Sequence, residues 1–236
     1  EHIMRFSAGK SFRRNDIYGQ HYSVTWPGGY FRGTDGLPPQ SVVNYELEYR
    51  TLAVPQHTIK IEAFQMRLKD AYFQNIIGSG PQIVKATTDN EYLIRGYIGE
   101  IQGWLFNDAL RWYANITLYH AVDDTANLRM SDVPRYTMNE GIQYLPMDDL
   151  YLSLDVHHQD GFKAVTDTTI TDNVNSLPEA TGVGSFTTVD SKIGYSPCED
   201  VELSLSVENL FNDRHYEFPL HQQWGRTLYV GVRIKW

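Results

Sequence analysis

The residues with the clearest capacity for ligand chemistry lie in one segment, YGQHYSVTWPGGYFRG, at positions 18–33. Aromatic rings stack on ligands and attract cations, and a guanidinium group pairs with carboxylates or phosphates. Pro27 and the two glycines after it favour a sharp turn. The segment therefore predicts either a ligand-binding loop or a loop tip that packs only on itself. If it binds a ligand, the expected contacts are Tyr22, Trp26, Tyr30, Phe31 and Arg32.

Histidines and acids suggest metal or hydrolytic chemistry, but their spacing favours neither. His157, His158 and Asp160 stand in a segment with strand-like alternation. Because adjacent strand residues point to opposite faces, the two imidazoles are not expected to bind one ion. His215 and His221 lie in the last long connection, where we expect solvated side chains or ligand contacts. No Ser, His and Asp spacing indicates a hydrolase, so we predict no catalytic residue, metal site or cofactor.

The charge and composition exclude several classes of function. The 236 residues include 20 Lys and Arg against 29 Asp and Glu, a net charge of −9, with no basic run. This balance argues against a nucleic-acid partner. Cys198 is the only cysteine, which excludes a disulfide framework and a cysteine-based metal site. No apolar run approaches the roughly 18 residues that a membrane-spanning helix needs.

Apolar and polar side chains alternate along almost the whole chain, which predicts β-strands. Strands in soluble proteins have a mode of about 5–6 residues, whereas strands that cross a bilayer at a steep tilt need about 9–11. Several of the expected strands reach eleven residues or more. About ten strands are expected, at residues 2–12, 41–51, 57–72, 90–106, 109–122, 134–145, 149–160, 186–196, 200–209 and 225–236.

The expected connections alternate between long and short. The long ones are residues 13–40, 73–89, 161–185 and 210–224, with a medium one at 123–133, and the others are turns of a few residues. All long connections then lie at one end of an up-and-down sheet. Outer-membrane barrels have this arrangement, with short periplasmic turns and longer extracellular loops.

The two faces of the expected strands differ in charge. On the last strand, Leu228, Val230, Val232 and Ile234 alternate with Tyr229, Gly231, Arg233 and Lys235. Over seven clear strands, Glu140 is the only charged residue on the apolar faces. This asymmetry fits lipid outside and a hydrated or plugged lumen inside, and in lipid the sheet must close because every backbone group needs a partner. We therefore predict an all-β fold, an antiparallel up-and-down transmembrane β-barrel.

The C-terminal segment SVENLFNDRHYEFPLHQQWGRTLYVGVRIKW resembles the end of TonB-dependent outer-membrane receptors. The matching pieces are the run 208–212, then Tyr216, then the run 225–227, which opens a last strand that ends on an aromatic residue. Upstream, the segments SAGKSFRR, NYELEYR, FQMRLKDAY and VPRYTMNEGIQY are similar to recurring strands of the family. The resemblance covers residues 1–236 as one domain, the C-terminal part of the barrel.

The resemblance implies a function and several partners. Such transporters have 22 strands and a plugged lumen, so the plug and the segment that contacts TonB are expected outside these residues. The implied ligand is a ferric siderophore, with cobalamin or an oligosaccharide as alternatives, and external loops bind it. Trp236 resembles the terminal aromatic that the barrel-assembly machinery reads. The implied location is the outer membrane of a Gram-negative bacterium.

Two alternatives belong to other classes. An outer-membrane barrel enzyme would need Asp, His and Ser clustered at the loop-side rim. A soluble β-sandwich that binds carbohydrate would also alternate in hydrophobicity, but its apolar face would be buried between two sheets.

Overall fold

The computed structural model consists of strands joined by turns and loops. It describes residues 1–14, 23–27, 29–32, 36–77, 82–125, 127–130, 132–163, 182–217 and 223–235. The ten long strands are β1 (His2–Arg13), β4 (Gln40–Thr51), β5 (His57–Ile77), β6 (Gln82–Leu105), β7 (Leu110–Asp123), β9 (Tyr136–Met147), β10 (Leu150–Gln159), β11 (Phe186–Cys198), β12 (Val201–Glu208) and β13 (Thr227–Ile234). Three short strands are β2 (Ser23–Trp26), β3 (Gly29–Arg32) and β8 (Leu128–Arg129).

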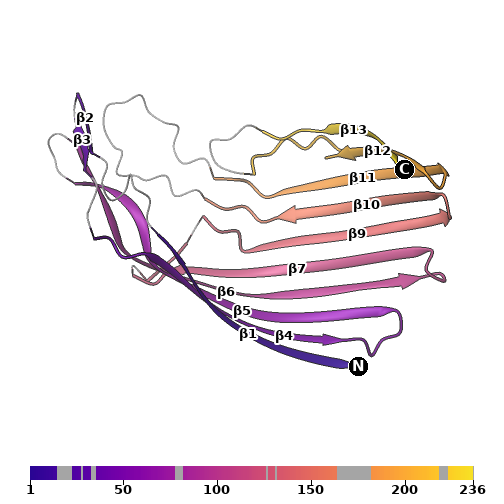
Figure 1. Ribbon diagram of the computed structural model, residues 1–236, viewed down its shortest axis with the longest axis horizontal. Coiled ribbons are helices and arrows are strands. Elements are labelled where there is room, and N and C mark those ends of the chain that lie inside the picture. The colour runs from indigo at the N-terminus through magenta and orange to yellow at the C-terminus, as the bar shows by residue number, and fades with distance from the viewer. Residues whose placement is uncertain are drawn as a thin grey trace.

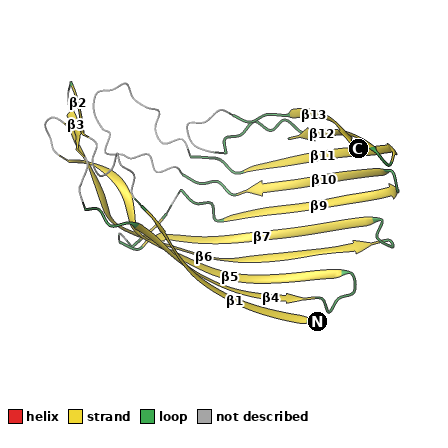
Figure 2. Cartoon of the chain, in the orientation of Figure 1, coloured by secondary structure: helices red, strands yellow, loops and turns green. Residues whose placement is uncertain are grey.

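The long strands form one curved antiparallel sheet, in which each strand pairs with the long strand before it in the chain (Figure 1). The order is β1-β4-β5-β6-β7-β9-β10-β11-β12-β13. This up-and-down order confirms the predicted fold class. Figure 2 shows strands joined by short turns at one end of the sheet. In the described ranges, no helix has the length and apolar character that a membrane span requires.

Both described ends of the chain lie at the end of the sheet that carries the short turns (Figure 1). Two of these turns, at Gln56 and at 106–108, use left-handed backbone conformations, which make tight reversals possible. Phe106, Asn107 and Asp108 have φ of 55°, 53° and 68°, and the amide of Ala109 donates to the carbonyl of Phe106 at 3.2 Å. We call this end the turn end and the opposite one the loop end.

One predicted loop is wrong. Most of residues 73–89 are strand, because β5 extends to Ile77 and β6 begins at Gln82, which gives strands of 21 and 24 residues. The register continues through pairs such as Phe73 with Thr87, after shifts between Leu68 and Phe73. Continued pairing gives each backbone N–H and C=O a partner. The β-branched residues of this segment also suit a pleated sheet.

The three short strands were not predicted from the sequence. β2 and β3 pair as a hairpin, and β3 also runs parallel to the start of β6, with Gly29 opposite Gln82. β8 pairs with the end of β7. Strands of two to four residues are too short for a period-two pattern to be recognised, so tertiary pairing defines them.

Exposure along the strands is the reverse of that in a soluble protein. In β4, Glu48 is 5% exposed, whereas its neighbour Leu47 is 48% exposed. In β13, Val230 is 78% exposed. The apolar face is therefore the open one, and the polar face is the more crowded one. A sheet of this kind needs an apolar medium around its open face.

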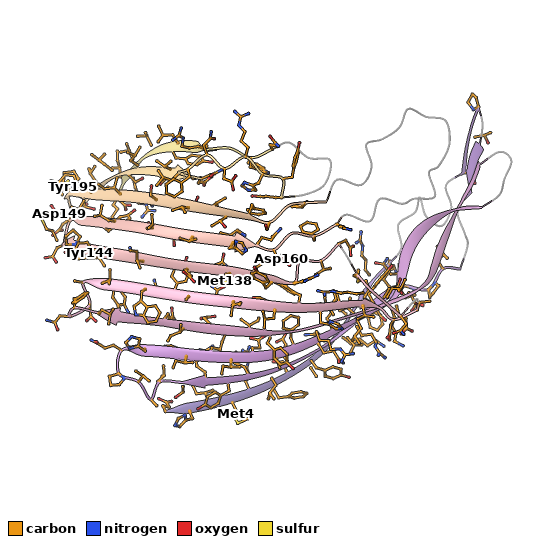
Figure 3. The ribbon with its side chains drawn as sticks, turned by 180° about the vertical axis from the view of Figure 1, so that it is seen from behind. Met4, Met138, Tyr144, Asp149, Asp160 and Tyr195 are labelled. Atoms are coloured by element: carbon orange, nitrogen blue, oxygen red, sulfur yellow. The ribbon has the colours of Figure 1, made fainter. Side chains whose placement is uncertain are left out.

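Aromatic side chains lie near the strand ends on the apolar face. Tyr144 of β9 and Tyr195 of β11 stand close to the turn end, near Asp149, and Asp160 lies toward the loop end (Figure 3). Tyr144 and Tyr195 are 43% and 45% exposed. Tyrosine settles at the boundary between hydrocarbon and head groups because its ring is apolar and its tip polar. These residues fit the aromatic girdle at one edge of a membrane-spanning barrel.

Glycines on the polar face allow tyrosine rings to lie flat against the sheet. Tyr113 of β7 is opposite Gly141 of β9, and Tyr151 of β10 is opposite Gly194 of β11. A Cβ atom added to either glycine would clash with the ring of the opposing tyrosine. The glycines therefore provide the close approach that the rings require, and the rings do not project from the face.

Candidate functional site

Hydrogen bonds that span three strands organise the polar face. Tyr113 of β7 crosses the glycine of β9 and donates its hydroxyl hydrogen to Oδ1 of Asp155 on β10, at 2.7 Å. Tyr151 of β10 crosses the glycine of β11 in the same way and donates to Oε1 of Glu202 on β12, at 3.3 Å. Hydrogen bonds to ionised acceptors are stronger than neutral ones. The repeated contact fixes both carboxylates on the polar face.

A second row of polar contacts runs directly across the strands. Asn139 of β9 donates from Nδ2 to Oδ1 of Asn115 on β7 at 3.0 Å, and its own Oδ1 lies 2.6 Å from Nδ1 of His157 on β10. An amide oxygen is only an acceptor, so Nδ1 of His157 carries the proton in this contact. The row gives three neighbouring strands a continuous polar surface.

Several charged groups of β1, β4 and β5 form ion pairs. Glu48 accepts from the guanidinium groups of Arg5 at 3.2 Å and Arg50 at 3.0 Å. Lys60 lies 3.1 Å from Glu100 on the neighbouring strand. Because buried carboxylates are costly without partners, these pairs explain how Glu48 is accommodated. The polar face as a whole suits a hydrated lumen or a polar domain within it.

The run 208–212 of the C-terminal segment has a structural role at the loop end. The amide of Asn209 donates to Oδ1 of Asp190 at 2.7 Å, and its side chain both donates to the carbonyl of Asp213 at 2.8 Å and accepts from the amide of Asp213 at 2.9 Å. Oδ1 of Asn212 accepts from the amide of Arg226 at 3.0 Å. These bonds connect β11, the last connection and the approach to β13.

The expectation that the His215 side chain is solvated is wrong. The side chain is buried, because its ring stacks on Phe186 at a centroid distance of 4.0 Å. Its Nδ1 lies 2.8 Å from the carbonyl oxygen of Asp213, and its backbone pairs with Trp224. An aromatic side chain from β11 therefore replaces the solvent that we expected around the imidazole. His221 lies outside the described residues.

The two adjacent histidines of β10 point to opposite faces, as predicted. His157 contacts Asn139 on the polar face, whereas Nδ1 of His158 lies 2.8 Å from Oγ1 of Thr187 and its ring stacks on Tyr136. Tyr136 belongs to the apolar face, opposite Leu118. The two imidazoles do not converge on a common point.

Four of the five predicted ligand contacts lie on one hairpin at the loop end. In its register Trp26 pairs with Gly29, while Tyr30, Phe31 and Arg32 follow on β3. Because β3 also pairs with β6, the hairpin is attached to the main sheet. Tyr22 lies outside the described residues. The hairpin thus brings the four positions together, and their contact with a ligand stays a prediction.

Glu140 occupies the apolar face, as its place in the alternation indicated. It pairs with Ala114 of β7 and Val156 of β10, both on that face, and it is exposed. The face that the sequence assigned to Glu140 is therefore correct, and the apolar face of the protein carries this one carboxylate within β9.

These features define a class of protein. One antiparallel up-and-down sheet, with an exposed apolar face and its long connections at one end, is the wall of an outer-membrane β-barrel. The alternative of a soluble sandwich is wrong, because the apolar residues are exposed instead of buried between two sheets.

Comparisons with known proteins identify the family. The model for the TonB dependent receptor-like β-barrel matches residues 1–210. The chain belongs to this family, whose members lie in the Gram-negative outer membrane. A search of curated proteins gives no significant match.

Solved structures share the fold at low sequence identity. The siderophore receptor PirA from Acinetobacter baumannii superposes with a TM-score of 0.77 at 18% identity, covering 99% of this chain and 39% of that one. The ferric enterobactin receptor PfeA, in complex with BCV-L6, gives 0.80 at 19%, covering 99% and 38%. The copper transporter OprC gives 0.74 at 14%, covering 99% and 37%. The chain therefore spans well under half the length of these proteins.

Proposed function

We propose that this chain is the C-terminal barrel portion of an outer-membrane receptor that binds a ferric siderophore and imports it with energy supplied by TonB. The observation that carries the proposal is the reversed sheet, with an apolar exposed face for lipid and a polar face bonded across its strands. Such a wall suits the passage of a polar ligand past a plug. We assign it no catalytic activity, since transport by capture and release requires no bond chemistry.

The choice of ligand rests on the family and on the named neighbours. PirA is named a siderophore receptor and PfeA a ferric enterobactin receptor, whereas OprC is named a copper transporter. In our proposal, the loop-end hairpin contributes to capture through Trp26, Tyr30, Phe31 and Arg32, together with Tyr22. Trp236, outside the described residues, is proposed to be read by the barrel-assembly machinery.

Uptake of radioactive iron tests the proposal. The full-length protein is produced in a Gram-negative strain that lacks its own siderophore receptors, with and without a functional TonB. We expect iron from a ferric siderophore to accumulate only when both are present. Uptake of cobalamin, an oligosaccharide or copper in place of iron would overturn the ligand assignment, and accumulation without TonB would overturn the energy source.

Substitutions in the hairpin test the capture site. Trp26→Ala and Arg32→Ala are expected to raise the Kd for the siderophore. Phe211→Ala is the matched control, because Phe211 is a 75% exposed aromatic residue in the connection after β12. Unchanged binding in Trp26→Ala and Arg32→Ala would show that the hairpin packs only on itself.

A further inference from the structure

The apolar face of the sheet carries a hollow of about 320 Å³ that spans β5, β6, β7 and β9. Its floor is Gly99 of β6 and Ala114 of β7, because these two residues are small and the residues around them are large. Sequence reasoning missed the hollow because it assigns residues to faces but does not place strands side by side. Two consecutive register rows form it, Ile59–Ile101–Ala114–Glu140 and Ile61–Gly99–Ile116–Met138.

Glu140 stands at the edge of this hollow, near mid-height of the membrane-spanning wall. Tyr136 and Tyr144 lie four residues to either side of it on the same face of β9. Each is about 13 Å away along the strand, at about 3.3 Å per residue. Figure 3 shows Met138, which also lines the hollow, between Tyr144 at the turn end and Asp160 toward the loop end. The apolar band of such barrels is about 25 Å tall, so the carboxylate lies near its middle.

The surroundings of Glu140 offer its carboxylate no partner within the described ranges. It forms no hydrogen bond or ion pair there. His158, on the same face, contacts Tyr136 and Thr187 instead. An unpaired acid in water needs no partner, but hydrocarbon offers no hydrogen-bond donor, so a charge on the lipid face carries a cost. Its neighbours on that face are all apolar: Ala114, Val156, Met138 and Ile142.

The hollow and the carboxylate together favour contact with another protein wall. Apolar surfaces in lipid have no hydrophobic driving force to associate, because lipid tails are equally apolar, so their association depends on close packing and hydrogen bonds. Gly99 and Ala114 permit a close approach, and Glu140 places a hydrogen-bonding group beside them. A lipid tail in the hollow would leave the carboxylate without a partner. Ionisable residues inside a membrane pair with one another or face a polar interior.

We propose that the surface formed by this hollow and Glu140 is a lateral contact between two copies of the protein in the outer membrane, with the two Glu140 side chains touching. Every copy lies at the same depth, so a two-fold axis along the membrane normal brings identical groups together. A carboxyl group that holds a proton is both donor and acceptor, and two carboxyl groups that share a proton satisfy each other. The inference depends on the membrane location of the barrel and not on the imported ligand.

Disulfide crosslinking in isolated outer membranes tests the contact. The full-length protein carries Cys198→Ser, which removes the only thiol of residues 1–236, and one new cysteine. Met138→Cys, in the hollow, is expected to give a disulfide-linked dimer. Leu205→Cys is the matched control, because it lies on the apolar face of β12, away from the hollow, and is expected to give none. No dimer from Met138→Cys, equal crosslinking at both positions, or a crosslink only to a different protein would overturn the proposal.

Substitutions at two positions separate the carboxyl group from the packing. Fluorescence energy transfer between two labelled pools of the purified full-length protein in lipid vesicles gives the association constant. Glu140→Leu is expected to lower this constant about tenfold, the effect of losing one hydrogen bond in lipid. Glu140→Gln keeps a donor and an acceptor and is expected to retain most of it. Gly99→Leu, whose side chain fills the hollow, is expected to lower it at least tenfold.

The outcomes decide between a contact and a carboxylate that lipid merely tolerates. Heat-modifiable migration on a gel shows whether each variant is folded. Unchanged association in folded Glu140→Leu or Gly99→Leu would refute the contact. A loss in Glu140→Gln as large as that in Glu140→Leu would refute the pairing of the two side chains. Glu140 faces away from the lumen, so a dimer that fails to form leaves the proposed transport standing.

Discussion

The orientation of the sheet makes a sharp prediction for two adjacent residues of β12. Leu205 lies on the apolar face, between Ile193 of β11 and Val230 of β13, and is 42% exposed. Ser204 lies on the polar face, between Gly194 and Gly231. The same substitution, to arginine, therefore places the same charge in lipid at position 205 and in the lumen at position 204.

The expected energies differ because the media differ. Arginine on the lipid face of a barrel costs about 2–4 kcal/mol at the bilayer midplane and less near the interfaces. Leu203 pairs with Tyr195, an aromatic residue near the membrane interface, and Leu205 lies two residues farther along β12. We therefore expect Leu205→Arg to cost about 2 kcal/mol, the lower end of the midplane range. Ser204→Arg is expected to cost about 0.5 kcal/mol, because its charge stays on the hydrated polar face. Gly231 leaves room beside it on β13, whereas the ring of Tyr151 covers Gly194 on β11. The difference corresponds to about a tenfold change in the folding equilibrium.

Folding of the full-length protein into lipid vesicles measures this difference. A urea titration followed by tryptophan fluorescence gives the free energy of unfolding, and heat-modifiable migration gives the folded fraction. Leu205→Arg should unfold at lower urea than the wild type, and Ser204→Arg at nearly the same urea. Equal loss in both variants, or a larger loss in Ser204→Arg, would refute our assignment of the two faces.

Three further predictions concern the polar face and the loop end. Gly141→Ala should lower the free energy of unfolding by about 1–3 kcal/mol, because the added methyl group clashes with Tyr113, and Gly99→Ala should cost less. Tyr113→Phe and Asp155→Ala should show a coupling energy of about 1.5 kcal/mol in a double-mutant cycle, since each removes the same hydrogen bond. Asn209→Ala should cost about 2 kcal/mol and speed proteolysis of the last connection, because it removes the two hydrogen bonds that the buried Asn209 side chain makes to the backbone of Asp213.

Each of these predictions has an outcome that contradicts it. At Gly99 an added Cβ atom would lie 3.6 Å from Ile116, an ordinary contact, so equal losses in the two glycine variants would show that the clash with Tyr113 does not govern the cost. Additive effects in the double-mutant cycle would mean that the hydrogen bond carries no net stability. For the loop, Asn127→Ala is the control, because Asn127 also has a left-handed φ, of 52°, but is exposed; equal proteolysis of both variants would remove the special role of Asn209.

The alternation of side chains determined the class of the fold. A period of two is a local property of a strand, so the ten long strands, their faces and the place of Glu140 follow from reading the chain in order. The end of the chain carried enough of the family's pattern to indicate the family, which the match over residues 1–210 confirms. The same local reading failed at residues 73–89, where turn-forming residues interrupt a hairpin that cross-strand pairing continues.

Only the tertiary structure decided how distant residues meet. Tyr113 bonds to Asp155 across an intervening strand, and that contact depends on register and on a glycine between them, which no local pattern contains. The stacking of His215 on Phe186 also depends on which segments lie side by side. The sequence determines the period and the faces because each is set by neighbouring residues. Sites arise from contacts between segments that only the pairing of distant strands brings together.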